Sequence, residues 1–140
     1  MSESLESKRL TSLAASDRGL PALVRAEKLG EHARKLAMDW RDLAAVLAKV
    51  REELDETEAA LARGDREAAA EEIGDLMLAL ASAPRFLDRS AEQVLSRACE
   101  KFVARFERVE QIAAERGLEL RSLDDAAIDQ LWNEAKKTWR

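Results

Sequence analysis

The sequence is poor in the residues that build β-sheets and disulfide-stapled domains. It has no tyrosine and few β-branched residues, which argues against a sheet because these residue types favour strands. Its single cysteine, Cys99, excludes an internal disulfide and favours a reducing cytosol. Only two prolines interrupt the chain. The composition therefore favours an all-helical fold.

Three further features are missing, and each excludes a class of protein. The net charge is −5, so general binding to nucleic acid is not expected, because phosphate backbones select basic surfaces. The N-terminal residues lack the apolar stretch of a signal peptide. No run approaches the roughly 20 apolar residues that a membrane-spanning helix needs. We therefore expect a soluble, cytoplasmic protein that binds neither nucleic acid nor membrane.

The chain does contain Ala-rich and Leu-rich segments, and its 140 residues suffice for one ordinary domain with one core. Residues 1–19 are Ser-rich and polar, and we expect them to form a tail. Residues 20–140 are expected to form a single all-α, bundle-like domain. The predicted helices span about 21–38, 42–63, 65–82, 90–116 and 122–136.

Residues with known roles at helix ends set these boundaries. Gly64 suits the position just after a helix, and Asp65 can cap the helix that follows. Pro84 cannot continue that helix without the loss of a hydrogen bond. The other predicted boundaries are a start at Pro21, a capping box of Ser90 with Gln93, a stop at Gly117, and a start at Ser122 or Asp124.

Acidic residues are concentrated in the segment EELDETE of the second predicted helix, where five of seven residues are acidic. Like charges four residues apart destabilise a bare helix by about a few tenths of a kcal/mol each. One interpretation is a solvated face, in which Lys49 and Arg51 pair with Glu53 and Asp55 four residues later. The other is a site that uses the negative charge.

Helical periodicity places these carboxylates relative to the apolar stripes. Glu53 lies at the edge of the stripe of its helix, Glu56 follows one turn later on the same flank, and Glu52 points nearly opposite. On the next helix, Glu72 falls inside the apolar arc and Asp75 lies on its flank. That helix is apolar nearly all round, so we expect it to be buried. An ionised carboxylate there costs several kcal/mol unless it is compensated.

Glu53 with Glu56 and Glu72 with Asp75 form two pairs of acids, each spaced three residues apart on its helix. Two such pairs on adjacent helices can aim four carboxylates at one point, as in bundles that hold metals between facing helices. The ligands would be hard oxygens, which select Mg²⁺, with Mn²⁺ as a possible substitute. A di-iron site is disfavoured because His32, the only histidine, has no glutamate three residues before it. Zinc is disfavoured because cysteine and histidine ligands are lacking.

The segments KVREELDE and EEIGDLMLAL resemble the EExxE…ExxD signature of the MazG-type all-α nucleoside triphosphate pyrophosphohydrolases. The likeness covers about residues 20–136 and includes PALVRAEKL, Asp39–Trp40, EKFVARFERVE, ERGLEL and LWNEAK. The chain is most similar to the catalytic C-terminal domain of the tandem MazG proteins. The resemblance implies Mg²⁺-dependent hydrolysis of an NTP or dNTP to the nucleoside monophosphate and pyrophosphate.

The resemblance also implies roles for individual residues. Glu52 or Glu56 would accept the proton of the attacking water, and the sequence does not choose between them. The implied metal ligands are Glu53, Glu56, Glu72 and Asp75, and the implied substrate-binding residues are Lys101, Arg105, Trp132 and Lys136. Helical spacing is compatible with these roles, but equally with a solvated basic edge and a core tryptophan.

Several positions depart from the family pattern. Leu78 and Ser82, followed by Pro84, stand where relatives often have phenylalanine and asparagine, and Cys99 replaces another common asparagine. The competing hypothesis is therefore a MazG-like helical binding or regulatory protein with weakened catalysis.

We also expect a homodimer or a higher homo-oligomer. A short helical chain that exposes a metal groove would gain core by pairing, with the active site near the interface.

Overall fold

The computed structural model describes residues 18–137, and within that range the chain is all-α, as predicted. These residues contain no strand. The α-helices are α2 (Ala22–Lys35), α3 (Leu43–Ala62), α4 (Arg66–Ala81), α5 (Ala91–Glu115) and α6 (Asp125–Lys136), with 3-10 helices η1 (Pro84–Leu87) and η2 (Leu120–Ser122). No helix in the described range is long and apolar enough to cross a membrane. Of the predicted tail, residues 1–17 lie outside the described range.

The described chain divides into two compact units, one up to Gln93 and one from Val94. The predicted extent of the domain, residues 20–140, stays a prediction.

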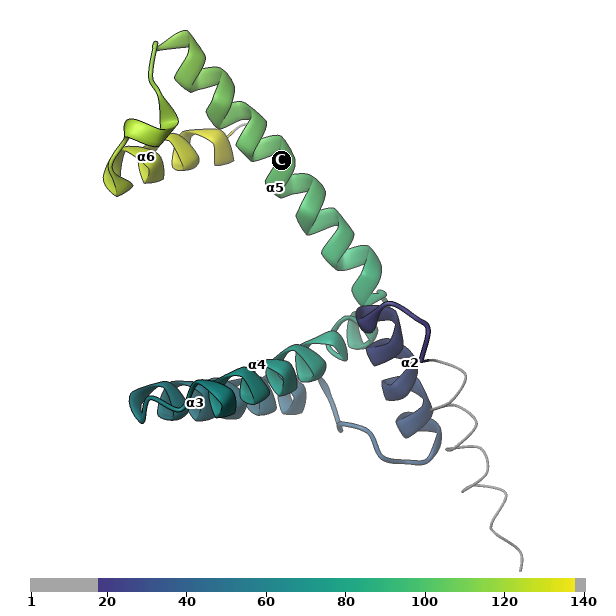
Figure 1. Cartoon of the computed structure of the whole chain (residues 1–140). Helices are drawn as coiled ribbons and strands as arrows, with labels where there is room; N and C mark the ends of the chain where they lie inside the picture. The colour runs from purple at the N-terminus through teal and green to yellow at the C-terminus, as the bar shows by residue number, and fades with distance from the viewer. Residues whose placement is uncertain (1–17, 138–140) are drawn as a thin grey trace, which may run out of the picture. The chain divides into compact units, whose positions relative to one another are not determined.

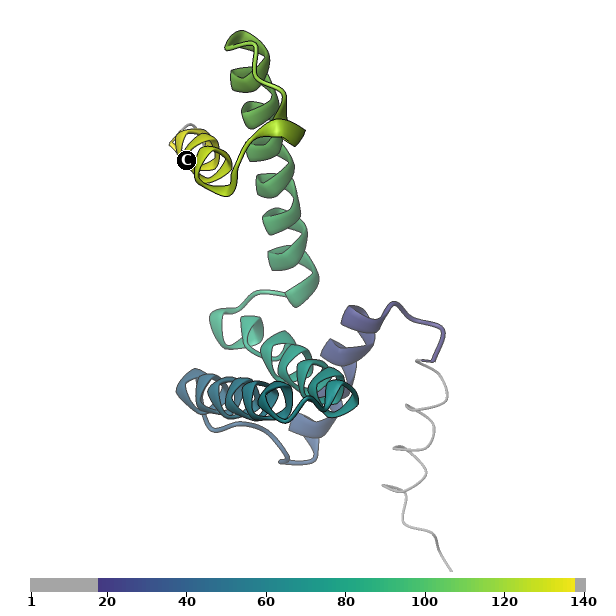
Figure 2. The ribbon, with the colours of Figure 1, turned by 60° about the vertical axis from the view of Figure 1, so that its left-hand side comes forward.

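Helices α3 and α4 form an antiparallel hairpin and lie side by side in both views of the ribbon (Figures 1 and 2). Asp42 caps α3 by accepting a hydrogen bond from the Ala45 N–H at 2.8 Å, and Asp65 caps α4 through the Ala68 N–H at 3.1 Å. Between them Gly64 has a φ of +73°, a conformation that glycine adopts without steric cost. The turn predicted from Gly64 and Asp65 is confirmed.

The seam between α3 and α4 is lined by a narrower set of residues than the sequence predicts. Its buried members are Val46, Glu53, Thr57 and Ala60 of α3, and Ala69 and Ala79 of α4. Glu53 is thus in the seam itself, not at the edge of the apolar stripe.

A second apolar stripe on each helix of the hairpin is exposed. The large apolar side chains on these stripes are Leu47, Leu54 and Leu61 of α3 and Ile73, Met77 and Leu80 of α4. Met77 has 66% of its surface exposed. The prediction that α4 is buried was therefore wrong for this unit, because α3 and the smaller contact with α2 leave part of a helix that is apolar nearly all round uncovered.

Helix α2 packs against α4 and ends three residues before the predicted Met38. It stops at Lys35 because Ala37 adopts a φ of +58°, which a right-handed helix does not contain. The segment that follows carries Asp39 and Trp40 toward η1, where the Arg85 guanidinium forms an ion pair with Asp39.

The start of α5 is fixed by contacts within the first unit. Ser90 accepts a hydrogen bond from the Gln93 N–H at 3.1 Å, as the capping box predicts. The Glu27 carboxylate of α2 accepts a second from the Glu92 N–H at 2.7 Å. The break at Pro84 is also confirmed, since Pro84 opens η1.

The second unit packs the rest of α5 against η2 and α6. Its core consists of Val109, Ile112, Leu131 and Ala135, with Leu120, Leu123 and Trp132 packed around it. Arg116 and Glu134 form an ion pair at 2.7 Å beside this core. Asp124, one of the two predicted starts, caps α6 by accepting a hydrogen bond from the Ala127 N–H at 2.8 Å.

Candidate metal centre

Three carboxylates converge at the α3–α4 seam. Glu53 and Glu56 are one turn apart on α3, and Glu72 approaches from α4. One oxygen from each lies within 4.8 Å of the others. The spacing of three residues puts two acids on one flank of α3, and the antiparallel hairpin brings the third opposite them. The sequence predicted all three as members of one site.

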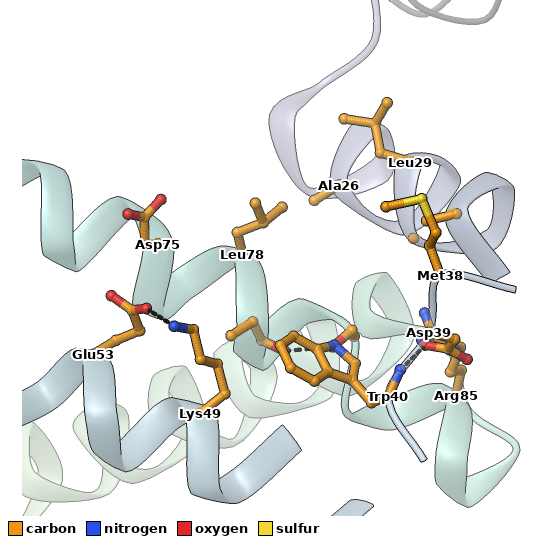
Figure 3. A pocket seen from close by; sticks show the side chains of 14 residues that line it. Ala26, Leu29, Met38, Asp39, Trp40, Lys49, Glu53, Asp75, Leu78 and Arg85 are labelled. Carbon is orange, nitrogen blue, oxygen red and sulfur yellow. Dashed lines mark hydrogen bonds and ion pairs between the residues drawn. The ribbon is translucent and has the colours of Figure 1, made fainter. Parts of the chain in front are cut away.

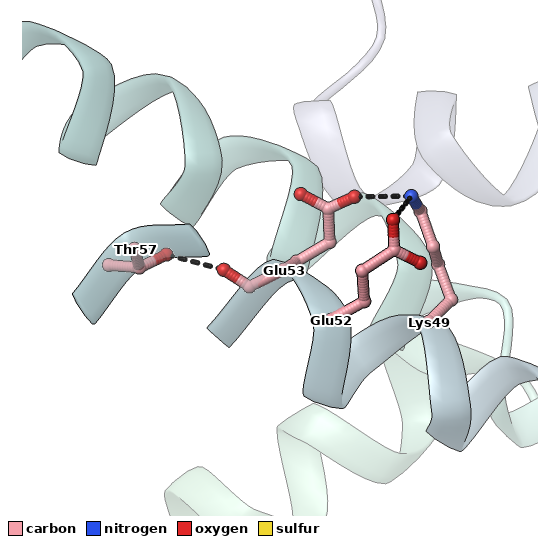
Figure 4. Close-up of polar contacts among 4 residues, drawn as sticks. All are labelled: Lys49, Glu52, Glu53 and Thr57. Carbon is pink, nitrogen blue, oxygen red and sulfur yellow. Dashed lines mark hydrogen bonds and ion pairs between the residues drawn. The ribbon is translucent and has the colours of Figure 1, made fainter. Parts of the chain in front are cut away.

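Glu53 is the most buried acid of this cluster, with 4% of its surface exposed. Its Oε1 accepts the Lys49 Nζ at 2.7 Å (Figure 4). Its Oε2 is buried and has no hydrogen-bond partner when Glu72 is ionised; a protonated Glu72 carboxyl is the one group in the cluster that can donate to Glu53. A buried carboxylate oxygen without a partner is costly, and a cation held by the three oxygens would satisfy it. The residues present therefore fit a metal ion bound by hard oxygen ligands.

The pKa values of the two facing acids, Glu53 and Glu72, are shifted in opposite directions. The neighbouring Glu53 carboxyl, partial burial and the Glu56 carboxyl together raise the pKa of Glu72 to about 7. The ammonium group of Lys49, and then Glu72, hold the pKa of Glu53 below its ordinary value. Without a metal, Glu72 is the acid that keeps a proton near neutral pH, and Glu53 is the one that stays ionised.

Asp75 and Glu52 lie outside this group of three carboxylates. Asp75 is exposed, one turn beyond Glu72 on α4, so the expectation of a dry environment around it was wrong. The reason is the exposed apolar side of α4 described above. Figure 3 shows Asp75 facing the same space as Glu53 from the neighbouring helix. Glu52 is exposed and accepts a hydrogen bond from the Lys49 Nζ at 3.2 Å.

A pocket of about 740 Å³ opens beside the cluster (Figure 3). One end holds Glu53 and Asp75, and the other holds Trp40 and the Asp39–Arg85 ion pair. Its remaining lining residues are Ala26, Leu29, Gly30, Ala33, Met38, Lys49, Leu78, Ala79 and Ser82. The volume is in the range typical of small-molecule sites.

The Asp39–Arg85 pair was not predicted from the sequence. The two residues are 46 positions apart, and no local pattern connects them. A β-carbon on Gly30 would lie 2.9 Å from the Arg85 Nη1, so the glycine gives the guanidinium its place in the pocket wall. Trp40 lines the pocket, with 37% of its surface exposed.

The predicted substrate-binding residues lie in the second unit. Lys101 and Arg105 are half-buried on α5, and neither forms an ion pair with any described residue. The Arg105 Nε is buried without a partner. Trp132 is half-buried on α6 with its ring 5.4 Å from that of Phe102, and Lys136 is exposed one turn later.

The positions that depart from the family pattern fall in two places. Leu78 and Ser82 line the pocket, and the Ser82 hydroxyl donates to the Ala79 carbonyl at 2.6 Å. Cys99 is an exposed free thiol on α5.

Comparison with known proteins identifies the family. The MazG nucleotide pyrophosphohydrolase domain matches residues 41–110. A nucleoside triphosphate pyrophosphohydrolase of Escherichia coli K12 is 41% identical over 122 residues, which are 86% of this chain and 46% of that protein. The nucleoside triphosphate pyrophosphohydrolase/pyrophosphatase MazG of Thermotoga maritima is 36% identical over 117 residues, 84% of this chain and 45% of that protein.

A further match, the uncharacterized protein YabN of Bacillus subtilis, is 41% identical over 69 residues, which are 49% of this chain and 14% of that protein. The chain spans about half the length of the two pyrophosphohydrolases that it matches. The matched segment contains the whole carboxylate cluster, and the chain belongs to the family of MazG nucleotide pyrophosphohydrolase domains.

Proposed function

We propose that this protein hydrolyses nucleoside triphosphates, NTPs or dNTPs, to the nucleoside monophosphate and pyrophosphate in a Mg²⁺-dependent reaction. The observation that carries the proposal is the group of three carboxylates, with its buried, unpartnered Glu53 oxygen, in a MazG domain. The E. coli and T. maritima relatives are named for this activity. We place the protein in the cytoplasm, in keeping with its single free cysteine.

In this proposal Glu53, Glu56 and Glu72 hold the metal, and Asp75 supplies a further carboxylate from the pocket side. Oxygen ligands alone favour Mg²⁺, with Mn²⁺ as a substitute. When bound, Mg²⁺ offsets the charge of the triphosphate, polarises the α-phosphoryl group and acidifies a water molecule.

The chain's own groups then have separate tasks. Glu52, which is exposed outside the cluster, or Glu56, the exposed member of the cluster, accepts the proton of the attacking water. Lys101 and Arg105 bind phosphate oxygens through charge-assisted hydrogen bonds. The Trp132 ring and the Lys136 ammonium group complete the contacts with the nucleotide. The unpartnered Arg105 Nε supports this assignment, because it leaves a donor free for an anion.

A second candidate function is a binding or regulatory protein with weakened catalysis. One hydrogen bond favours it: the Ser82 hydroxyl donates its proton to the Ala79 carbonyl of its own helix. The resemblance implies an asparagine at this position, and a serine whose hydroxyl proton is bonded within its own helix does not offer a ligand the same donor.

We further propose that the chain forms a homodimer or a higher homo-oligomer. The exposed apolar stripes of α3 and α4 support this, since contiguous apolar surface on a folded unit usually marks an interaction site. Sedimentation of the purified chain tests it, and a monomer at micromolar concentration would contradict it.

The direct test of the proposed reaction is pyrophosphate release from the common NTPs and dNTPs with Mg²⁺, repeated with EDTA. An enzyme releases pyrophosphate from at least one of them only when the metal is present. A chain that binds Mg²⁺ and nucleotide without release would support the binding protein instead.

A further inference from the structure

A second pocket, of about 430 Å³, shares Asp39, Trp40 and Arg85 with the pocket beside the metal centre. Figure 3 shows these three residues together, at the end of the larger pocket away from Glu53. All the residues that line the second pocket belong to the first unit. No member of the carboxylate cluster lines it, so the proposed reaction gives this pocket no role.

Positive charge predominates in the second pocket, which we call the basic pocket. Its charged lining residues are four cations and two acids: Arg34, Lys35, Arg41 and Arg85, with Glu31 and Asp39. Arg85 and Asp39 are paired with each other. The side chains of Arg34, Lys35 and Arg41 form no ion pair with any described residue. Three unpaired cations therefore line one pocket of a chain whose net charge is −5.

Helix stability accounts for only part of this charge. Arg34 and Lys35 are in the last turn of α2, where the helix dipole favours a cation. Arg41 directly precedes Asp42, the N-cap of α3, and at that end of a helix the dipole disfavours a cation. Helix α3 itself gains nothing from the charge of Arg41, whereas an anion in the basic pocket would be attracted by it.

The lining of the basic pocket indicates the chemical class of that anion. Guanidinium groups bind phosphate oxygens through paired, charge-assisted hydrogen bonds. Trp40, with 37% of its surface exposed, adds aromatic surface on which a planar ring can stack. Phe86 completes the lining, with the Arg85 guanidinium 5.0 Å from its ring centre. The volume is in the range of small-molecule sites. These features fit a small phosphate-bearing molecule.

We propose that the basic pocket is a second, metal-independent binding site, in which Arg34, Lys35 and Arg41 hold the phosphate group of a nucleotide or of an inorganic polyphosphate. The bound phosphate competes with Asp39 for the Arg85 guanidinium, because Arg85 lines the same pocket. This inference does not rest on the proposed hydrolysis, since the site uses neither the carboxylate cluster nor a metal.

The experiment titrates inorganic pyrophosphate and, separately, each of the four ribonucleoside monophosphates into the full chain in EDTA, with calorimetry as the readout. EDTA removes the metal without which the carboxylate cluster repels an anion. Wild type should bind at least one of these probes. Arg34→Met and Arg41→Met should each weaken that binding by roughly 10-fold, the loss of one charge-assisted hydrogen bond.

Asp39→Asn should have the opposite effect and tighten binding several-fold. It removes the competitor for Arg85 and one negative charge from the pocket. The asparagine keeps a side-chain oxygen to accept the hydrogen bond that the Trp40 N–H donates to Asp39 at 2.8 Å. An affinity that Asp39→Asn left unchanged would overturn the competition for Arg85.

Two control variants separate this pocket from other sources of positive charge. Arg51→Met changes the net charge equally, and Arg51 is exposed on α3, outside the basic pocket and without an ion pair to a described residue. Arg105→Ala removes a predicted phosphate contact of the second unit. Both variants should bind the probe as wild type does.

The pattern across the variants decides the proposal. Stronger binding of a monophosphate than of pyrophosphate, weakened by Arg34→Met and Arg41→Met, identifies a nucleotide as the ligand, and the reverse order identifies a polyphosphate. Equal weakening by Arg51→Met would show general charge attraction only and would overturn the site. So would the absence of binding to wild type, or binding lost in Arg105→Ala and kept in the Arg34 and Arg41 variants. A failed pyrophosphate-release assay would contradict the proposed function and leave this result standing.

Discussion

The two units of this chain differ in the side chains that are packed between their helices. The α5–α6 unit buries Val109, Ile112, Leu131 and Ala135 in an ordinary apolar core. The α3–α4 hairpin instead places Glu53 and Glu72 where its seam would otherwise be apolar. Its large apolar residues, such as Met77, are left on the exposed side.

This difference indicates which unit carries the chemistry. An apolar core is stable without a ligand, whereas facing carboxylates repel each other unless a proton or a cation lies between them. The raised pKa of Glu72 and the Lys49 ammonium on Glu53 are two partial substitutes for that cation. The first unit should therefore respond to metal, and to pH near neutrality. The second unit should not respond to metal, and the lowered pKa of Glu134 beside Arg116 makes its stability depend on pH only toward the acid side.

The largest expected effect is that of Glu72→Gln, which keeps the shape of the side chain and removes one ligand charge. Pyrophosphate release should fall by orders of magnitude. The metal-free protein should be as stable as wild type or more so, above all at a pH where Glu72 would be ionised. Turnover that survived the substitution would make Glu72 a structural acid and would move the site elsewhere.

Leu131→Ala makes the matching change in the second unit, where Leu131 is 3% exposed. The free energy of unfolding should fall by about 2–5 kcal/mol, the usual cost of such a cavity. Because the change is in the apolar core, the Mg²⁺ affinity of the folded protein should stay the same. Denaturant unfolding and Mg²⁺ calorimetry measure the two quantities, and a large loss of Mg²⁺ affinity would break the comparison.

Arg105→Ala tests whether the second unit contributes to substrate binding. Loss of one charge-assisted hydrogen bond should weaken NTP affinity or turnover by roughly 1.5–3 kcal/mol. Mg²⁺ binding without nucleotide should hardly change, because Arg105 forms no ion pair with a described acid. A variant that bound NTP normally, or lost Mg²⁺ binding as well, would show that Arg105 is a structural residue.

A smaller effect concerns pH. Between the ordinary pKa of 4.5 and the raised value of about 7, folded Glu72 holds a proton that the unfolded chain has released. The metal-free protein should therefore lose stability as the pH rises through this window, and then level off. Since Mg²⁺ needs the ionised form, its affinity should rise up to about pH 7 and stay constant above it. Calorimetry at several pH values measures this, and an affinity independent of pH would contradict the raised pKa.

Much of the local structure could be predicted from the sequence, because single residues at helix ends decide it. Gly64, Asp65, Pro84 and Ser90 all act as expected. Helical spacing predicted that four carboxylates on adjacent helices meet at one point, and three of them, Glu53, Glu56 and Glu72, do so in the structure.

The rest could not be predicted, because it depends on which of several possible faces meets a partner. Helix α4 is apolar nearly all round, so periodicity does not select the side that packs on α3, and the exposure of Asp75 was missed for that reason. The Asp39–Arg85 pair needs α2 and η1 to be placed first. No sequence pattern in either segment predicts this ion pair.

The central claim is that the α3–α4 seam is completed by a metal ion, and the melting temperature of the wild-type chain tests it most directly. The measurement compares millimolar Mg²⁺ with EDTA at a pH above the pKa of Glu72. A ligand present at a hundred times its dissociation constant stabilises the folded state by about 2.7 kcal/mol. We predict a clearly higher melting temperature with Mg²⁺ than with EDTA, and the same melting temperature in both would contradict the account.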